Sequence, residues 1–544
     1  MPEFHTKLDT GSEAFAQNRA DMLARIEEWH GLSARAEALS EKRRSRFEER
    51  GQLTPRERVH RLLDPGMPFV ELYGMANFLV EDPDPETSIP GASLICGIGF
   101  VEGVRCMIVA DDSGIDAGAA TRMTLDKMIG VMDLSLRMKL PFVHLVESAG
   151  ANLLNFAVET WSRAGGWYYR LARLSAAGIP TITVLHGPST AGGAYMPGMS
   201  DYVIAIKKRG RAALAGAALL HAATGEVADE EELGGAEMHA TKSGLVEYLA
   251  DDDAHGLVLA RAVVAGLDWN RHCAAPPQVS QADGFNEPLN SPDEIAGLVP
   301  FDTKKPYDVR EVIARLVDGS DIEDFKPRYG AATVCLHASI HGHRCGILGN
   351  NGPIDPDGAT KGAHFIQLCD QARHPLIFLN NTTGYIVGTE YEQAGMIKHG
   401  SKMIQAVANV RVPRIALYIG SSYGAGNYGM SGQGFEPDFV LSWPTAKIGL
   451  MGGEQAAGTM SHVARVGAQR RGTEIDEEVL KAREQEILEH YERQSSIFYT
   501  SGRVLDQGLI DPRDTRKVLA FLLDTCWEAR NRTLQPNVFG VARM

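Results

Sequence analysis

The chain has 544 residues and a formal net charge of −15, from 54 Lys and Arg against 69 Asp and Glu. So acidic a surface argues against nucleic acid as a partner, because binding to phosphodiester chains depends on cationic side chains that release counterions. Hydrophobic residues make up 44% and charged residues 23%, which excludes the composition of a disordered chain and predicts sizeable cores.

The seven cysteines include no C-x-x-C pair. This spacing predicts reduced thiols, no zinc ribbon and no bound metal. The first nine residues lack the apolar core of a signal peptide, and no stretch approaches the roughly 18 apolar residues of a membrane span. We therefore expect a soluble protein of the cytoplasm.

The N-terminal 50 residues predict amphipathic helices, because apolar positions at helical spacing lead into a charged tract. After Gly51, Thr54 is placed to cap a helix that begins with Pro55, with Glu57 three residues after the cap. We interpret residues 1–50 as a helical extension and residues 51–285 as a first compact domain.

Prolines at five positions and a lack of periodicity mark residues 276–300 as the connection between two halves. We place the boundary within residues 281–298 and a second domain at residues 298–544. Three segments of the first half recur in the second, in the same order and 233 to 239 residues further on: 103–112 and 342–351, 141–150 and 375–384, and 179–195 and 412–428.

This repeat predicts two similar α/β domains in tandem, because each copy alternates β-rich runs with helical stretches such as 124–138 and 361–373. In both copies an apolar run, 181–186 or 414–419, enters a small-residue turn followed by a sequence that can be helical. Such a turn presents successive backbone N–H groups at a helix N-terminus, where the dipole favours negative charge.

The amides of these turns predict two oxyanion holes, one in each half. Gly192 and Gly193 occupy the same place in the first copy as Ala425 and Gly426 in the second. Small side chains let a ligand oxygen approach both amides of a pair. Two such holes can stabilise two enolate-like oxygens in one reaction.

A competing motif lies in the second turn, where residues 420–424 fit the G-x-S-x-G nucleophile elbow with Ser422 as the nucleophile. Asp476, His462 and His490 are formally available as triad partners. This serine-esterase alternative leaves the repeat unexplained. An acyl-CoA hydrolase or hydratase of the crotonase fold, and a non-catalytic scaffold that binds acyl-CoA, are further alternatives.

The motifs of both halves resemble the carboxyltransferase β subunit of biotin-dependent acyl-CoA carboxylases, in particular the methylcrotonyl-CoA and geranyl-CoA carboxylase branch. The resemblance covers nearly the whole chain. Its carriers include LTPRER (53–58), AGGAY (191–195), ATGE (223–226), GNNG (349–352), GAHFIQLC (362–369), NTTGY (381–385), YGAGNYGM (423–430) and MGGEQAA (451–457).

The resemblance implies two crotonase-like domains, each a ββα superhelix, with the active site between the N-domain of one subunit and the C-domain of another. It implies carboxyl transfer from carboxybiotin to an acyl-CoA. The Gly192 and Gly193 amides would hold the thioester carbonyl, and the Ala425 and Gly426 amides the ureido carbonyl of biotin. It further places Ala191, Ala194, Tyr195, Lys127, Arg122 and Gly216 on the acyl-CoA side, and Thr383, Gly384, Tyr385, Ile386, Asn427, Tyr428 and Met430 around the biotin and acyl pocket.

Biotin has to come from a partner, because the sequence contains no Met-Lys-Met biotinylation motif and no glycine-rich ATP-binding segment. The resemblance therefore implies a separate α subunit with biotin carboxylase and carrier domains, around a hexameric β core. Departures from the family pattern affect the CoA contacts. Ala217 and Ala218 replace two prolines, His221 stands where a lysine is common, and Lys127 is the one cation left of a Lys-Lys-x-x-Arg stretch.

Overall fold

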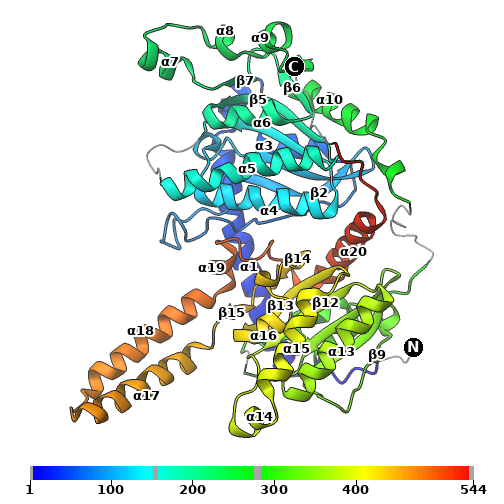
Figure 1. The fold of residues 1–544 in the computed structure, drawn as a ribbon, viewed down its shortest axis with the longest axis vertical. Helices are drawn as coiled ribbons and strands as arrows, with labels where there is room; N and C mark the ends of the chain where they lie inside the picture. Colours follow the sequence, from blue (N-terminus) through cyan, green and yellow to red (C-terminus); the bar gives the residue numbers. More distant parts are fainter. Residues whose placement is uncertain (1–3, 151–156, 275–283, 303, 538–544) are drawn as a thin grey trace. The chain divides into compact units, whose positions relative to one another are not determined.

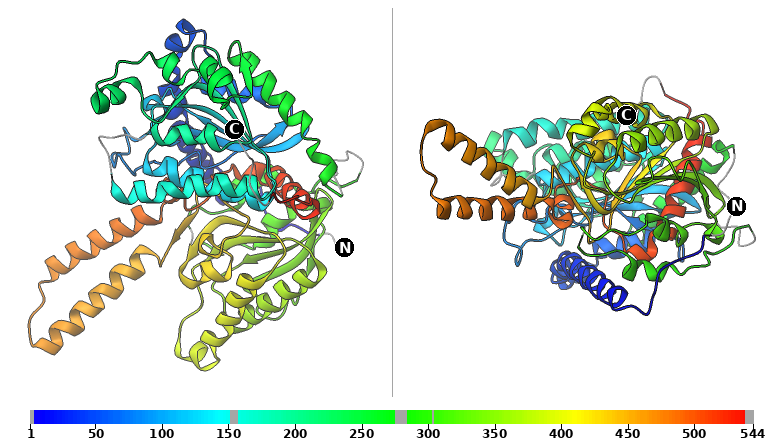
Figure 2. Two further views of the ribbon diagram at one scale, coloured as in Figure 1. Left: turned by 45° about the horizontal axis from the view of Figure 1, so that its top comes forward. Right: turned by 90° about the horizontal axis from the view of Figure 1, so that it is seen from below.

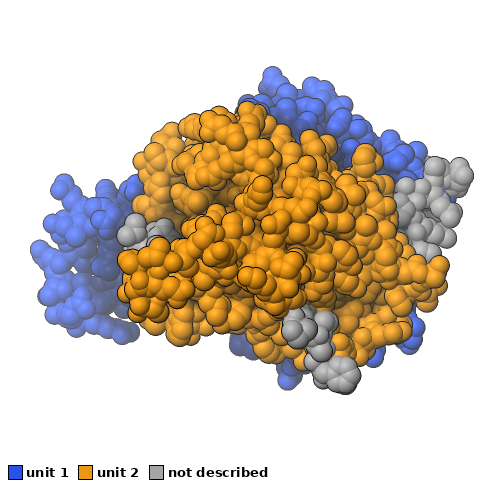
Figure 3. Space-filling model, turned by 90° about the horizontal axis from the view of Figure 1, so that it is seen from above, with its two compact units in different colours: residues 1–30, 279–501, 505–523 blue, residues 31–278, 502–504, 524–544 orange. Residues whose placement is uncertain are grey.

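The computed structural model describes residues 4–537 apart from 151–156, 275–283 and 303. Contacts divide the chain into two compact units that interleave in sequence (Figure 3). Unit 1 comprises residues 1–30, 279–501 and 505–523, and unit 2 comprises residues 31–278, 502–504 and 524–544. Each unit therefore combines one half of the internal repeat with short segments from elsewhere in the chain.

Unit 2 is built on an eight-stranded sheet of order β1-β2-β3-β4-β5-β6-β8, in which β7 also pairs with β5. β2 and β3 form an antiparallel hairpin, and β3 to β6 run parallel. The long strands are buried along nearly their whole length, as expected of a parallel sheet covered on both faces. The strands are Val70–Glu71 (β1), Leu94–Val101 (β2), Val104–Asp111 (β3), Phe142–Ser148 (β4), Thr181–Thr190 (β5), Tyr202–Ile206 (β6), Arg211–Ala213 (β7) and Tyr248–Ala250 (β8).

Unit 1 repeats this topology in a seven-stranded sheet of order β14-β13-β12-β11-β10-β9, with β15 paired to β13. β10 and β11 form the hairpin, and β11 to β14 run parallel. The match of hairpin, parallel strands and short flanking strand confirms the predicted duplication of an α/β fold. The strands are Glu323–Asp324 (β9), Thr333–Ile340 (β10), His343–Asn350 (β11), Leu376–Thr382 (β12), Arg414–Tyr423 (β13), Phe439–Ser442 (β14) and Lys447–Gly449 (β15).

The helices of unit 2 include α4 and α5, which pack against each other (Figure 1). The capping box predicted for α3 is present: Thr54 Oγ1 accepts from the Glu57 amide, and Glu57 Oε2 accepts from the Thr54 amide. The helices are Arg44–Glu49 (α2), Pro55–Leu62 (α3), Arg122–Met138 (α4), Val158–Ala176 (α5), Tyr195–Met199 (α6), Ala217–Thr224 (α7), Glu230–Gly234 (α8), Ala236–Met238 (α9) and Asp253–Gly266 (α10).

In unit 1, α17 and α18 form a long hairpin, drawn in orange in Figure 2. α1 (Glu13–Glu41), in the predicted helical extension, and α20 (Thr515–Asn531) each contribute residues to both units. The remaining helices are Ile295–Leu298 (α11), Val309–Ala314 (α12), Pro356–Ala372 (α13), Thr389–Gln393 (α14), Met396–Asn409 (α15), Gly424–Gly429 (α16), Gly453–Arg471 (α17), Glu477–Ser495 (α18) and Ile497–Ser501 (α19).

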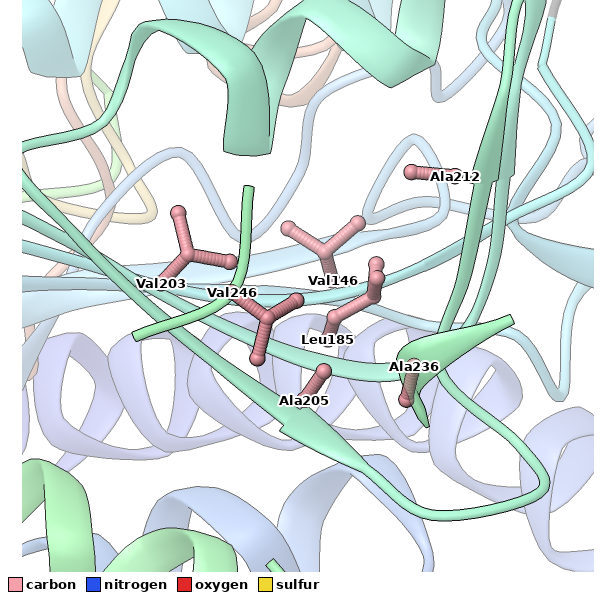
Figure 4. Packing of buried hydrophobic residues seen from close by; sticks show 7 residues of the cluster. All are labelled: Val146, Leu185, Val203, Ala205, Ala212, Ala236 and Val246. Carbon is pink, nitrogen blue, oxygen red and sulfur yellow. The ribbon is translucent and has the colours of Figure 1, made fainter. Parts of the chain in front are cut away.

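A cluster of buried side chains supports the region where β5 ends (Figure 4). It consists of Val146, Leu185, Val203, Ala205, Ala212, Ala236 and Val246. Ala194, in the predicted turn, packs against this cluster. Full burial of a Val or Leu side chain is worth about 1.5–3 kcal/mol, so the turn is anchored on a well-stabilised layer.

All seven cysteines are buried and free, as predicted for reduced thiols. Within the described ranges, no helix combines the length and the apolar character needed to cross a bilayer.

Candidate active site

The two predicted turns have the same backbone conformation. β5 ends at Thr190 (φ −112°, ψ 161°), and a 3₁₀ turn follows over Ala191–Ala194. β13 ends at Tyr423 (φ −113°, ψ 149°), and α16 follows directly. The first residue of each short helix lies in the left-handed region, with φ +54° at Ala191 and +55° at Gly424. The likeness of the two copies therefore extends to single backbone angles.

This conformation explains why the amide pairs can bind an anion. Gly192 and Gly193 are the second and third residues of their turn, as Ala425 and Gly426 are in α16. The first N–H groups of a helix have no acceptor within it. A left-handed residue followed by right-handed ones also aims successive amides at one point, forming a nest for an anion. Each pair thus has the geometry of an oxyanion hole; its role stays a prediction.

A second feature shared by the two copies places a neighbouring strand against each turn. The pairing of β4 with β5 shifts register before Ser148, and that of β12 with β13 shifts before Thr382. The chain then passes through Gly150 (φ +86°) or Gly384 (φ +121°), values that favour glycine. A Cβ at either glycine would lie 3.4 Å from the carbonyl oxygen of the residue before the turn.

Close packing also explains why glycine occurs within the amide pairs. A Cβ on Gly192 would stand 2.5 Å from Tyr168 Oη, and one on Gly426 would stand 2.7 Å from Gly384 Cα. Tyr168 lies on α5, and its ring centroid is 5.8 Å from that of Tyr195. Sequence reasoning missed Tyr168, because no spacing rule connects the middle of α5 with the turn after β5.

The two cations predicted to bind CoA differ in burial. Lys127 is fully buried, and its Nζ donates to the carbonyl oxygens of Gly91 (3.2 Å) and Leu94. This position leaves no face for a phosphate, so the interpretation of Lys127 as a CoA ligand does not hold. The signal was present in the sequence, because Lys127 lies in the same helical stripe as the buried Met123 and Val131.

Arg122, in contrast, points to solvent. Its side chain is 63% exposed and lies 3.9 Å from Asp126, which also accepts a hydrogen bond from Arg163 at 2.5 Å. Gly216 directly precedes α7, and nothing lies within 4 Å of a Cβ built on it. Tyr195 is 48% exposed and begins α6 immediately after the turn.

The residues predicted around the second turn fall into an exposed set and a buried set. Thr383 and Tyr428 are exposed, Ile386 is half-buried, and the Tyr428 ring stacks on Phe435 with centroids 5.7 Å apart. Tyr385 is half-buried: its hydroxyl donates to the Gly400 carbonyl at 3.3 Å, and burial raises its pKa.

Met430 is fully buried beneath the turn, where its carbonyl accepts from Asn380 at 3.1 Å and its sulfur from Asn350 at 3.6 Å. Tyr385 and Met430 therefore shape the support of the turn from within unit 1. Thr383 and Tyr428 are therefore the exposed members of the predicted pocket set, and Tyr385, Ile386 and Asn427 are half-buried.

Ser422 is a structural residue rather than a nucleophile. It is completely buried within β13, donates to Asn380 Oδ1 at 2.9 Å and accepts from Asn427 Nδ2 at 2.9 Å. Both of its side-chain contacts are carboxamides, whereas the serine of a nucleophile elbow needs a histidine as its base. This arrangement does not support the serine-esterase alternative.

Comparison with known proteins gives matches along the whole chain. The carboxyl transferase domain family matches residues 46–541. The chain is 45% identical over 543 residues, 99% of both chains, to a Mycobacterium tuberculosis protein named "Probable biotin-dependent acyl-coenzyme A carboxylase beta2 subunit". It is 40% identical over 547 residues to the biotin-dependent 3-methylcrotonyl-coenzyme A carboxylase beta1 subunit of the same organism, covering 99% of this chain and 100% of that one.

Among solved structures, the β subunit of geranyl-CoA carboxylase from P. aeruginosa is 46% identical, with a TM-score of 0.93 and 100% coverage of both chains. These findings confirm the family resemblance drawn from the motifs. They also confirm the fold class that it implied, two crotonase-like domains with a helical N-terminal extension.

Proposed function

Since this chain belongs to the carboxyl transferase family, we propose that it is the carboxyltransferase β subunit of a biotin-dependent acyl-CoA carboxylase. The observation that carries the proposal is the duplicated amide pair, Gly192–Gly193 and Ala425–Gly426, each at the second and third positions of a short helix after a buried strand. Such a duplication suits a reaction in which negative charge develops on two carbonyl oxygens.

The first pair would act on the acyl-CoA. The acyl group would give a proton to biotin that has lost its carboxyl group as CO2. The charge left behind would move onto the thioester oxygen, and the Gly192 and Gly193 amides would stabilise it by hydrogen bonds that strengthen with that charge. Loss of one oxyanion donor typically costs about 2.7–4 kcal/mol of activation free energy. The backbone thus supplies much of the catalysis without a charged side chain.

The second pair would hold the ureido carbonyl of biotin. The amides of Ala425 and Gly426 fit an uncharged acceptor oxygen that gains negative charge, because a nest of N–H groups binds such an oxygen at any pH. Carboxybiotin, delivered by a partner subunit, would supply the carboxyl group. Thr383, Ile386, Asn427 and Tyr428 are the exposed or half-buried residues that we propose beside it.

For the CoA moiety we propose Arg122, with Ala191, Ala194, Tyr195 and Gly216 along the acyl chain and the pantetheine arm. Arg122 has an exposed guanidinium and a single carboxylate 3.9 Å away, which leaves donors for a phosphate. Relatives named for 3-methylcrotonyl-CoA and geranyl-CoA support a branched, α,β-unsaturated acyl group as the substrate.

The names of the relatives as β subunits also support a partner α subunit that carries biotin carboxylase and biotin, and we propose a hexameric β core. The complex of this chain with its α subunit should fix ¹⁴C-bicarbonate into acyl-CoA in a reaction that needs ATP and biotinylation. A panel from propionyl-CoA to geranyl-CoA identifies the substrate. Absence of fixation with every member would overturn the proposed function.

A further inference from the structure

A buried cluster of ionisable side chains lies against β5, the strand that leads into the first amide turn of unit 2. We call it the Arg58 cluster; its members come from four elements: Arg58 (α3), Glu147 (β4), His186 (β5) and Asp253 (α10). Each of them is at most 5% exposed. Arg58 Nη1 donates to Glu147 Oε2 at 2.6 Å, and Arg58 Nε donates to Asp253 Oδ2 at 3.1 Å.

Further contacts extend the Arg58 cluster. His186 Nδ1 lies 3.0 Å from Asp253 Oδ1. The side-chain Nε2 of Gln52 donates to Glu147 Oε1 at 3.2 Å and to the backbone carbonyl of His186 at 3.3 Å. The Glu147 amide donates to Asp111 Oδ2 at 3.1 Å, and the other oxygen of Asp111 lies 3.3 Å from His144 Nε2.

The charges of the Arg58 cluster follow from these contacts. Burial alone would raise the pKa of both carboxylates. Arg58 lowers the pKa of Glu147, and the adjacent His186 ring followed by Arg58 lowers the pKa of Asp253, so both side chains are ionised. Burial and the Arg58 charge lower the pKa of His186, which is therefore neutral near pH 7. One cation balances two carboxylates, and Arg58 is the member on which that balance depends.

The Arg58 cluster is connected to the amide turn through two strands. Glu147 directly precedes Ser148, which pairs with Ser189 at the end of β5. The Glu147 side chain also lies across Gly187, where a Cβ would stand 2.5 Å from Glu147 Cγ. Gly187 is five residues before Gly192, so a shift of Glu147 moves the strand that carries the amides.

The second copy has the same support without the charge. Asn381 takes the place of Glu147, and its backbone N–H donates to Asn350 Oδ1 at 3.3 Å. Its side chain lies across Gly420, five residues before Ala425. Asn350 corresponds to Asp111. The two copies therefore share one mechanical arrangement, built from carboxylates in the first half and from carboxamides in the second.

We propose that Arg58 and Glu147 are positioning residues for the Gly192–Gly193 amide pair, and that Arg58 neutralises the carboxylates beside the strand that leads to it. This inference rests on the proposed function. Without Arg58, the Glu147 and Asp253 charges would stand unbalanced beside β4 and β5, the strands that lead to the turn built to stabilise a negative oxygen. The biotin side has no such dependence, because Asn381 is neutral at every pH.

The decisive comparison is between Arg58→Gln, Glu147→Gln and the double variant, each in complex with the α subunit. Arg58→Gln should lower kcat about a hundredfold at pH 8, with a smaller change in KM for acyl-CoA. Its kcat should rise as the pH falls toward 6, because a buried carboxylate without its cation takes up a proton. Glu147→Gln should lose no more than about fivefold, and the double variant should recover at least about tenfold over Arg58→Gln.

Two further variants separate charge from folding. Arg58→Lys should retain the wild-type pH profile, and Asn381→Asp should reproduce the loss and the pH signature in the second copy. Thermal unfolding and hexamer content identify a variant that has not folded. The inference is overturned if Glu147→Gln lowers kcat as much as Arg58→Gln does. It is also overturned if the pH profiles of Arg58→Gln and Asn381→Asp match that of the wild type. An inactive wild-type complex would instead overturn the proposed function.

Discussion

The contact between Gly192 and Tyr168 allows the role of the first amide pair to be tested with two substitutions. In Gly192→Ala the new Cβ stands 2.5 Å from Tyr168 Oη, about 0.9 Å closer than an ordinary contact. The next nearest atom is Tyr168 Cζ at 3.7 Å, which is already an ordinary contact. The hydroxyl oxygen is therefore the sole source of the clash.

The expected size of the effect lies at the low end of the cost of overpacking, about 1–3 kcal/mol, because the clash is with the end of a half-buried side chain. A strain of about 1 kcal/mol that is borne by the turn corresponds to about a fivefold fall in kcat. Tyr168→Phe removes the hydroxyl and the clash together. Gly192→Ala should then be tolerated, and the double variant should lie within about threefold of Tyr168→Phe alone.

The assay is the carboxylation rate of the α–β complex with saturating acyl-CoA, measured for the wild type, both single variants and the double variant. The cycle should give a coupling energy of about 1 kcal/mol, the size expected for residues in contact. Circular dichroism melts of the isolated chain show how much of the strain appears as lost stability. The reasoning fails if Gly192→Ala is equally inactive with and without the Tyr168→Phe substitution, or harmless in both backgrounds.

Three other changes test separate parts of the site. Gly426→Ala should lower kcat about a hundredfold, and no side-chain truncation should rescue it, because the new Cβ meets the Gly384 backbone at 2.7 Å; steady-state kinetics of the complex measure this. Lys127→Met should lower the melting temperature and leave KM for acyl-CoA within about twofold of the wild type. Arg122→Ala should raise that KM about tenfold. Equal changes in KM for the two variants would refute the assignment of Arg122, rather than Lys127, to CoA binding. His186→Ile should reduce the loss of unfolding free energy below about pH 6.5, and urea unfolding at several values from pH 5 to 8 measures this. The folded pKa of His186 is lowered, so the unfolded state binds the proton more readily, and stability is lost as the pH drops through the unfolded value.

Much of the fold could be predicted because duplication leaves a signal in the sequence. The offsets between repeated segments predicted two α/β halves, and the Thr54 capping box could be placed from three residues. Both signals are local or periodic, so they survive without knowledge of tertiary contacts. The position of each amide pair could be predicted for the same reason.

One residue was assigned wrongly, and the positions of others could not be predicted. The cationic stretch of the family predicts Lys127 as a CoA ligand, although its place in the helical stripe with Met123 and Val131 indicates burial. Tyr168 is brought to the first turn by the packing of α5, and Arg58 to Glu147 on the neighbouring strand by the packing of α3, which no spacing in the sequence encodes. The two turns could thus be located from the sequence, but not the side chains that pack against the strands and turns.

The two turns also show what maintains their shape. Ala191 and Gly424 adopt left-handed φ values within 1° of each other, although this region costs an L-residue such as alanine roughly 1 kcal/mol that glycine does not incur. If local sequence preference set the conformation, Ala191 would relax and the copies would differ. Their agreement indicates that the flanking strand, the register shift of its neighbour and the packed layer beneath hold the nest. Backbone strain at Ala191 is therefore maintained by the surrounding fold, as expected where a turn must keep its amides aimed at a ligand.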